Sequence, residues 1–298
     1  MHDFDYEAPV DLDTALRLFS EQNGGARALA GGTDLIDQIR LGRYTPDVLV
    51  DIKKLPELNV LDSQAGGLRI GAAVPCSKIY QNEAVVSDYE AIVDSCRIIG
   101  GVQIQNRASV GGNLCNSGPA ADSTPSLIVL GGRCVIASTQ GQREVPAEDF
   151  CTGPGKNVLQ QGEILVEIRF SSRSERSGSH YRRFIPRYEM DIAVVGVGAS
   201  VTLDETGETF VEARIALGAV APTPLFAREA SESLAGQPVN DETIARAAEL
   251  AQQIARPIDD MRGTKEFRIH VTGVLTRRVL AAAIARARGE KEETRIGH

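Results

Sequence analysis

The stretch VQIQNRASVGGNLCNSGPAADSTPSLIVLGG, residues 102–132, contains the features on which the fold prediction depends. A glycine pair, Gly111 and Gly112, is followed by a short polar segment, the acid Asp122 and a predicted helix with Pro125 in its first turn. Glycine has no Cβ, so its backbone can approach a ligand closely, and consecutive N–H groups that point the same way bind anions. The stretch therefore predicts a phosphate site.

A second stretch of similar composition lies upstream, at residues 28–35 (ALAGGTDL). An apolar run meets Gly31 and Gly32, and Thr33 is then placed to cap a helix. Either pair alone is more consistent with a tight turn between elements than with a ligand site. Two pairs, each near an acid, favour a diphosphate held between two loops. Neither pair has the G-x-G-x-x-G spacing of a Rossmann loop, and the chain contains no G-x-x-x-x-G-K-[ST] motif.

Composition restricts the class of protein. The chain has 298 residues, 42% hydrophobic and 24% charged, which is ordinary for a soluble globular protein and long enough for two domains. The net charge of −8 disfavours nucleic acid as a partner, because phosphate contacts need a basic face. The acidic start MHDFDYEAPVDLD does not read as a signal peptide, and the longest apolar run, residues 193–201, is too short for a membrane span. We expect a cytoplasmic protein.

The cysteines do not predict a metal site. They lie 17 to 20 residues apart with no C-x-x-C pair, whereas zinc and iron–sulfur sites usually take ligands from closely spaced pairs. We expect buried thiols, and only Cys115 lies near enough to a glycine pair to touch a ligand. No general base or nucleophile stands out, so no catalytic residue is predicted. The five cysteines are Cys76, Cys96, Cys115, Cys134 and Cys151.

The order of elements predicts an α+β fold in two parts. Residues 171–179 (SSRSERSGS) are polar and small, which is typical of a linker, so we place a domain boundary near residue 175. Beyond it, residues 191–203 and 212–220 predict a hairpin within a three-stranded antiparallel sheet covered by helices. These helices are expected at residues 225–234, 241–254 and 264–288. Before the boundary, strands are expected at residues 26–30, 46–52, 68–74, 133–138 and 163–170, and helices after Asp11, after Thr33, over residues 84–98 and after Asp122.

Three motifs in fixed order resemble the FAD-binding medium subunit of the molybdenum hydroxylases, a family that includes bacterial xanthine dehydrogenases and carbon monoxide dehydrogenase. The motifs are AGGTDL (30–35), ASVGGNLCNSGPAAD (108–122) and RRFIPRYEMDIAVVGVG (182–198). The resemblance covers about residues 4–288. It implies a two-part FAD-binding domain of the vanillyl-alcohol-oxidase type, followed by a small α+β domain. The expected units are 1–175, with subdomains of about 1–57 and 58–175, then 176–288 and a frayed tail at 289–298.

The resemblance also implies which residues contact FAD. Residues 28–35 and Ser109–Asn113 match the two pyrophosphate loops, and Asp122 matches an acid on the ribose or adenosine side. The backbone of Ile164 and Leu165 matches a strand near the flavin or adenine, and Arg183 and Tyr188 belong to a segment beside the isoalloxazine ring. A helix-capping role for Asp34 or Asp122 stays open. The full set is Ala28, Leu29, Ala30, Gly31, Gly32, Thr33, Asp34, Leu35, Ser109, Val110, Gly111, Gly112, Asn113, Asp122, Ile164, Leu165, Arg183 and Tyr188.

The function implied by the resemblance is electron transfer by non-covalently bound FAD. The implied partners are a large subunit with a molybdenum cofactor and a small subunit with two [2Fe-2S] clusters, assembled as a dimer of heterotrimers. Electrons would pass to NAD⁺ or another acceptor. Two letters depart from the common pattern: Gln105 stands where many relatives have Arg, and Arg183 where many have Lys. The alternatives are a stand-alone FAD-dependent oxidoreductase on the same fold, and a scaffold without flavin.

Overall fold

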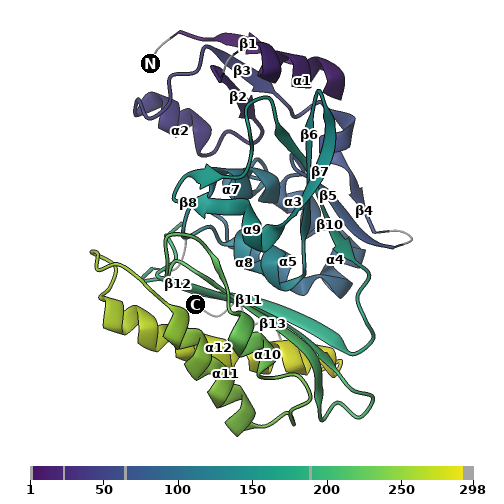
Figure 1. Cartoon of the computed structure of the whole chain (residues 1–298), viewed down its shortest axis with the longest axis vertical. Coiled ribbons are helices and arrows are strands. Elements are labelled where there is room, and N and C mark those ends of the chain that lie inside the picture. Colours follow the sequence, from purple (N-terminus) through teal and green to yellow (C-terminus); the bar gives the residue numbers. More distant parts are fainter. Residues whose placement is uncertain (1–2, 23, 64–65, 188–189, 291–298) are drawn as a thin grey trace.

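The computed structural model describes residues 3–22, 24–63, 66–187 and 190–290. The described elements are arranged in tiers along the long axis, with the N-terminal part at one end and the C-terminal helices at the other (Figure 1). The first tier is a three-stranded parallel sheet in the order β1-β3-β2. Its elements are β1 (Asp5–Glu7), α1 (Leu12–Glu21), β2 (Ala26–Leu29), α2 (Leu35–Arg40) and β3 (Val48–Asp51).

Local sequence explains α1 directly. The Asp11 carboxylate accepts a hydrogen bond of 2.8 Å from the Thr14 N–H and so caps the helix. Helical spacing then places Ala15, Leu16 and Phe19 on the face that packs against β2 and β3. The predicted helix after Asp11 is confirmed.

The second tier is a five-stranded antiparallel sheet in the order β4-β5-β10-β6-β7, with short helices packed beside it. The helix expected over residues 84–98 is two helices, because the backbone at Tyr89 leaves the helical region at φ −132° and ψ 49°. The elements are η1 (Pro56–Asn59), β4 (Leu61–Asp62), β5 (Gly67–Gly71), α3 (Cys76–Ile79), α4 (Glu83–Asp88), α5 (Glu90–Cys96), α6 (Val102–Gln105), α7 (Val110–Asn116), α8 (Ser123–Val129), β6 (Arg133–Ser138), β7 (Gly141–Pro146), α9 (Ala147–Phe150), β8 (Cys151–Gly153), β9 (Lys156–Asn157) and β10 (Ile164–Ser171).

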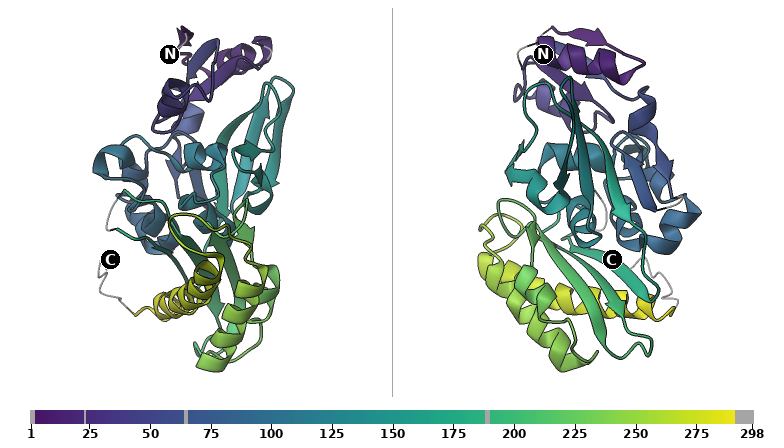
Figure 2. Two further views of the ribbon diagram at one scale, coloured as in Figure 1. Left: turned by 90° about the vertical axis from the view of Figure 1, so that its left-hand side faces the viewer. Right: turned by 45° about the vertical axis from the view of Figure 1, so that its right-hand side comes forward.

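The third tier contains four antiparallel strands, so the expectation of three was wrong. The extra strand is only two residues long and pairs with β13 at the point where a helix was expected to start. Helices α10 and α12 contact this sheet, α11 packs against both of these helices, and α5 and α8 of the second tier contact the sheet as well. Figure 2 shows the C-terminal helices beside the sheet. The elements are β11 (Ser177–Phe184), β12 (Val195–Leu203), β13 (Phe210–Gly218), β14 (Leu225–Phe226), α10 (Arg228–Glu232), α11 (Asp241–Ile254) and α12 (Lys265–Ala287).

The predicted linker is shorter than expected. Strand β10 continues to Ser171 and β11 begins at Ser177, so only residues 172–176 connect the two sheets. Ser179 is fully buried: its Oγ donates to Glu90 of α5 and accepts from the Ala91 N–H. Polar, small residues suggested a solvated segment, but here they form close contacts between the tiers. We retain a domain boundary near residue 175 as a proposal.

A partly buried charge network joins the second and third tiers. The Asp94 carboxylate on α5 lies 2.7 Å from His180 Nδ1 of β11, and Arg286 of α12 donates to both of its oxygens, at 2.7 and 3.1 Å. Burial alone raises the pKa of Asp94, but hydrogen bonds from His180 and Arg286 outweigh burial and lower it. The ionised carboxylate therefore stabilises the contact between α5, β11 and α12.

We predict that Asp94→Asn lowers the free energy of unfolding by about 3 kcal/mol, because it removes the charge that pairs with Arg286 and His180 between the tiers. The measurement is urea unfolding at pH 7. The control is Asp37→Asn, which removes the exposed pair with Arg40 and is expected to cost about 0.5 kcal/mol or less. Equal losses in the two variants would contradict a stabilising role for the Asp94 network.

Candidate functional site

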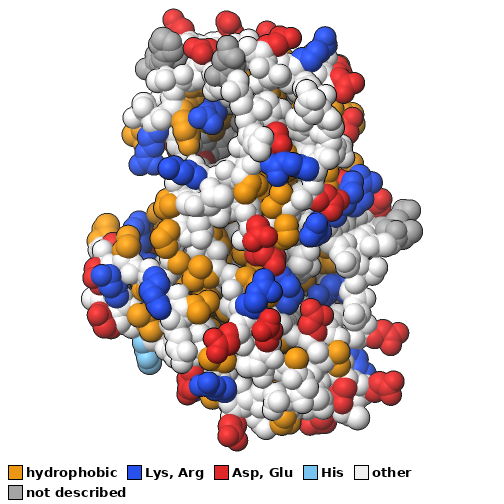
Figure 3. Space-filling view, in the orientation of Figure 1, with side chains coloured by type: hydrophobic (Ala, Val, Ile, Leu, Met, Phe, Trp, Pro, Cys, Tyr) orange, Lys and Arg blue, Asp and Glu red, His pale blue; other side chains and the backbone are white. Residues whose placement is uncertain are grey.

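A cleft of about 1170 Å³ is lined by segments of all three tiers. The surface is hollowed where the N-terminal tier meets the rest of the molecule (Figure 3). The walls of the cleft include the two glycine segments, the start of β10 and the end of β11. The cleft is larger than the 300–1,000 Å³ typical of pockets for drug-sized ligands, so it can accept a dinucleotide-sized molecule.

The first glycine pair is shaped by a close backbone approach. A Cβ added at Gly31 would lie 2.1 Å from the carbonyl oxygen of Arg107, so only glycine fits there. Gly32 has φ +77°, a conformation that L side chains rarely adopt. Within the described part of the chain, the N–H groups of Gly31, Gly32 and Thr33 donate to no protein acceptor. The segment therefore presents unused donors at the cleft wall, as an anion site requires.

The predicted cap by Thr33 is not formed. Helix α2 begins at Leu35, its N-cap residue is Asp34, and the Asp34 side chain makes no capping hydrogen bond. Asp34 and Thr33 instead line the cleft. The reason is that the chain is still in a turn at Thr33, so this hydroxyl lies too early to cap the helix.

The second glycine pair lies in the first turn of α7 rather than in a loop. Ser109 is the N-cap residue, and its Oγ accepts a 3.0 Å hydrogen bond from the Gly112 N–H. A Cβ at Gly111 would lie 2.5 Å from the Ala72 carbonyl oxygen, so Gly111 is required by packing. A Cβ at Gly112 would meet only Ser109 Oγ, at 3.0 Å, and Gly112 lines the cleft. Gly112 is therefore the glycine of this pair whose absent side chain leaves room for a ligand.

Asp122 does not cap α8, although it occupies the N-cap position. Its Oδ1 accepts a 2.8 Å hydrogen bond from the Tyr181 hydroxyl, and its Oδ2 pairs with Arg183. The Arg183 side chain is only 6% exposed and lines the cleft together with Asp122. Burial raises the pKa of Asp122 to about 6, although Arg183 and the Tyr181 hydrogen bond act in the opposite direction. The carboxylate is therefore mostly ionised at neutral pH.

The structure gathers most of the predicted site residues at this cleft. Leu29 and Val110 do not line it: Val110 is fully buried in the core, and Leu29 packs beside Gly32. Tyr188 lies outside the described residues. The residues that do line it are Ala28, Ala30, Gly31, Gly32, Thr33, Asp34, Leu35, Ser109, Gly111, Gly112, Asn113, Asp122, Ile164, Leu165 and Arg183.

Several cleft residues had no recognisable signal in the sequence. Arg27 lies over the ring of Tyr44 at 4.5 Å, and both line the N-terminal side. Asn116 accepts a 2.9 Å hydrogen bond from Gln38, which connects α7 to α2 across 78 residues. From the third tier, the buried Arg268 donates to the carbonyl oxygens of Val194 and Ala219. These pairings depend on tertiary contacts between residues far apart in the sequence, so spacing along the chain does not predict them.

The remaining sequence predictions concern thiols, histidine and Gln105. Cys115 lines the cleft, but burial raises the pKa of its thiol to about 12, so it stays protonated. His180 belongs to the Asp94 network and does not line the cleft. Gln105 is buried, accepts from the Tyr80 hydroxyl and donates to the Arg97 carbonyl, so it holds α6 in place.

Among the described residues, no group of three His, Cys, Asp or Glu side chains is placed to hold a metal ion.

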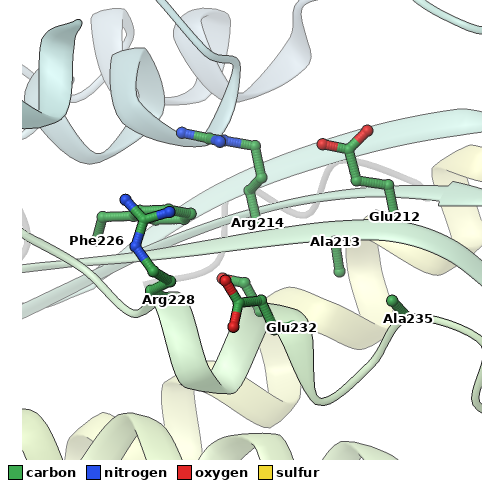
Figure 4. Close-up of a pocket in the computed structure, with 8 residues that line it drawn as sticks. Glu212, Ala213, Arg214, Phe226, Arg228, Glu232 and Ala235 are labelled. Atoms are coloured by element: carbon green, nitrogen blue, oxygen red, sulfur yellow. The ribbon is translucent and has the colours of Figure 1, made fainter.

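A second, much smaller hollow of about 190 Å³ lies on the third tier. Arg214 and Arg228 both approach the ring of Phe226, at 4.2 and 5.0 Å (Figure 4). Arg214 is already bonded to the Ile128 carbonyl and to Glu148. The hollow is too small for a dinucleotide, so the large cleft is the candidate site.

The family models decide the identity. The FAD binding domain in molybdopterin dehydrogenase matches residues 2–171, and the CO dehydrogenase flavoprotein C-terminal domain matches residues 180–283. The chain belongs to the FAD-binding medium subunits of the molybdenum hydroxylases. It is thus an FAD-binding subunit of an oxidoreductase of the xanthine dehydrogenase and carbon monoxide dehydrogenase type.

Individual relatives agree over nearly the whole chain. A xanthine dehydrogenase FAD-binding subunit of Escherichia coli O157:H7 is 34% identical and covers 97% of this chain and 99% of its own. The carbon monoxide dehydrogenase medium chain of Hydrogenophaga pseudoflava is 29% identical, covering 95% and 98%. A solved carbon monoxide dehydrogenase from the same organism has a TM-score of 0.91 at 29% identity, over 95% of this chain and 98% of that one. Quinoline 2-oxidoreductase from Pseudomonas putida 86 gives a TM-score of 0.87 at 29% identity, covering 97% and 98%.

The two glycine segments and the start of β10, which line the cleft, fall within residues 2–171, the range matched by the FAD-binding domain model. None of the described helices is long and apolar enough to cross a membrane.

We predict a pH dependence that reports on Asp122. Its pKa is about 6 in the folded state against about 3.9 in an unfolded chain, so the folded state binds more protons between these values. The free energy of unfolding therefore falls as pH rises from about 4 to 6, and this contribution, about 2 kcal/mol, is lost in Asp122→Asn. The measurement is urea unfolding of both proteins at pH 4, 5, 6 and 7. Parallel profiles for the two proteins would contradict the raised pKa.

Proposed function

We propose that this subunit binds FAD non-covalently in the cleft and passes electrons from iron–sulfur clusters of a partner subunit to NAD⁺ or another acceptor. One observation carries the proposal: Gly31 lies against the backbone of Arg107 and Ala108, directly before Ser109. The two glycine segments are therefore adjacent in space, although 76 residues separate Gly31 from Arg107. A diphosphate between them would meet the unused N–H donors of residues 31–33 on one side and the first turn of α7 on the other.

The residues present fit a flavin dinucleotide. The N–H groups of Gly31, Gly32 and Thr33 have no acceptor among the described residues, and a Cβ added at Gly112 in the same cleft would meet only Ser109 Oγ. A net charge of −8 gives no general attraction for an anion, so local donors must supply it. We propose that these two segments hold the pyrophosphate of FAD.

We propose that the remaining predicted contacts orient the rest of the cofactor. Asp122 has free acceptor capacity for a sugar or ribityl hydroxyl, because each of its oxygens accepts one protein hydrogen bond. The backbone at Ile164 and Leu165 forms the start of β10 at the cleft wall. Bound FAD would supply the redox chemistry, while this chain's residues bind it, orient it and keep water from part of its surface.

The charged side chains at the cleft set its electrostatics. Arg183 is paired with the ionised Asp122, so this part of the wall carries a fixed ion pair rather than a free cation. Arg268 is likewise paired with Asp260. We propose that these pairs position hydroxyl groups of FAD, and no side chain of the cleft is needed as a general base or nucleophile.

A non-covalent link is favoured by the position of His180. Its ring lies 2.7 Å from Asp94 in the network between the tiers, and the residue does not line the cleft. Cys115 lines the cleft, but its thiol is held protonated by burial. We therefore expect FAD to be released intact on denaturation.

We propose the partners from the relatives. Those compared here are named as subunits or medium chains of xanthine and carbon monoxide dehydrogenases, and this chain covers 98–99% of their length. On that basis it would assemble with a molybdenum-cofactor large subunit and a small subunit carrying two [2Fe-2S] clusters, as a dimer of heterotrimers. We also propose the units 1–175, 176–288 and the tail 289–298.

We predict that the purified chain, after FAD addition and desalting, shows flavin absorption near ~450 nm that moves to the supernatant on acid precipitation. Gly112→Asp is expected to lose this absorption, because it adds a side chain and a negative charge where phosphate binds. The control is Gly153→Asp on β8, where a Cβ would meet only Lys156 at ordinary distances of 3.8 and 3.9 Å.

Flavin that stays in the acid pellet would indicate a covalent link and a stand-alone oxidase. Failure of the unsubstituted chain to bind FAD would overturn the proposed function, and equal retention of FAD by the two glycine variants would overturn the assigned phosphate site.

A further inference from the structure

Tyr181 does not line the cleft, but its hydroxyl donates a hydrogen bond to Asp122, which does. Tyr181 is only 3% exposed. Burial and the neighbouring Asp122 carboxylate raise the pKa of Tyr181 well above its usual value. The hydroxyl therefore stays protonated and donates to Asp122 at all ordinary pH values.

Strand geometry brings these groups together. Alternate residues of a strand point to the same face, and on β11 the residues Ser179, Tyr181 and Arg183 all bond toward α5 and α8. Tyr181 donates to Oδ1 of Asp122, and Arg183 donates to Oδ2 of the same carboxylate. The orientation of Asp122 is therefore fixed from one strand of the third tier.

The neighbouring strand is adapted to the tyrosine hydroxyl. Gly196 of β12 lies opposite Arg183 in the register, and a Cβ added there would lie 2.5 Å from the Tyr181 hydroxyl oxygen. The next atoms of the ring would be farther away, at 3.3 and 3.4 Å. Glycine at this position thus leaves room for the hydroxyl in particular.

We propose that Tyr181 is a positioning residue for FAD: its hydroxyl orients the Asp122 carboxylate toward the cofactor and against Arg183, and Gly196 is glycine to admit that hydroxyl. This inference rests on the proposed function of the cleft. Tyr181 acts only through Asp122 and does not itself touch the cofactor.

The Tyr181 hydroxyl is expected to influence the pKa of Asp122. Arg183 and Tyr181, both on β11, are the groups that act on its pKa. The glycines of β12 in this region carry no charge: Gly196 approaches the Tyr181 hydroxyl and Gly198 approaches Pro125. A hydrogen bond to the ionised carboxylate favours the ionised form, so loss of the hydroxyl shifts the titration of Asp122 to higher pH.

The test is fluorescence titration of the FAD-free full chain with FAD, from pH 5 to 9, for the unsubstituted protein and Tyr181→Phe. We expect affinity to fall as pH drops through the titration of Asp122, and Tyr181→Phe to move that midpoint to higher pH. At pH 8 we expect about ten-fold weaker binding, within the range for loss of a hydrogen bond to a charged group. The control is Tyr89→Phe, a buried tyrosine whose hydroxyl donates to the Ser171 carbonyl away from the cleft.

A second measurement tests the geometry without the cofactor. Gly196→Ala is expected to lower the melting temperature of the chain with Tyr181, because the new Cβ meets the hydroxyl oxygen. In the Tyr181→Phe background the same substitution is expected to cost clearly less, since the closest clash is gone.

Additive effects on melting temperature, or an unchanged midpoint and affinity in Tyr181→Phe, would overturn the inference while leaving the proposed function intact. Absence of any FAD binding by the unsubstituted chain would instead defeat the proposed function itself.

Discussion

The close backbone approach of Gly31 to Arg107 is the constraint on which the cleft depends. The segment that follows β2 lies so close to the Arg107 carbonyl oxygen that a Cβ at Gly31 would be 2.1 Å from it. Arg107 Nε also donates to the Gly31 carbonyl oxygen at 3.3 Å. As a result, the turn before α2 lies beside the first turn of α7. Both segments therefore line one cleft, and we propose that they share a single diphosphate.

A second connection joins this FAD-binding part to the third tier. Asp122 precedes α8, yet its carboxylate bonds to Tyr181 and Arg183 of β11. Strand β12 supports the contact by having glycine at two positions, where side chains would meet Tyr181 and Pro125. Residues of the third tier therefore complete the wall of the cleft, and Arg183 meets the cleft as an ion pair with Asp122.

Local signals explain which parts could be predicted. Helix α11 matches the expected residues 241–254, because Asn240 caps it and apolar spacing runs through it. Strand β14 was missed, because two residues carry no periodic pattern and their pairing with β13 is tertiary. The family resemblance assigned Asp122 and Arg183 to different parts of FAD and could not reveal their mutual pairing, which spans 61 residues. It also could not separate Gly111, required by packing against Ala72, from Gly112, which leaves space for a ligand.

The most direct test of the central claim is a crystal structure of the chain grown with saturating FAD. The account predicts density for the pyrophosphate between residues 31–33 and 111–113, with the ribityl or ribose hydroxyls near Asp122 and no covalent bond to the protein. FAD bound outside this cleft, or a cleft free of FAD density at saturation, would contradict it.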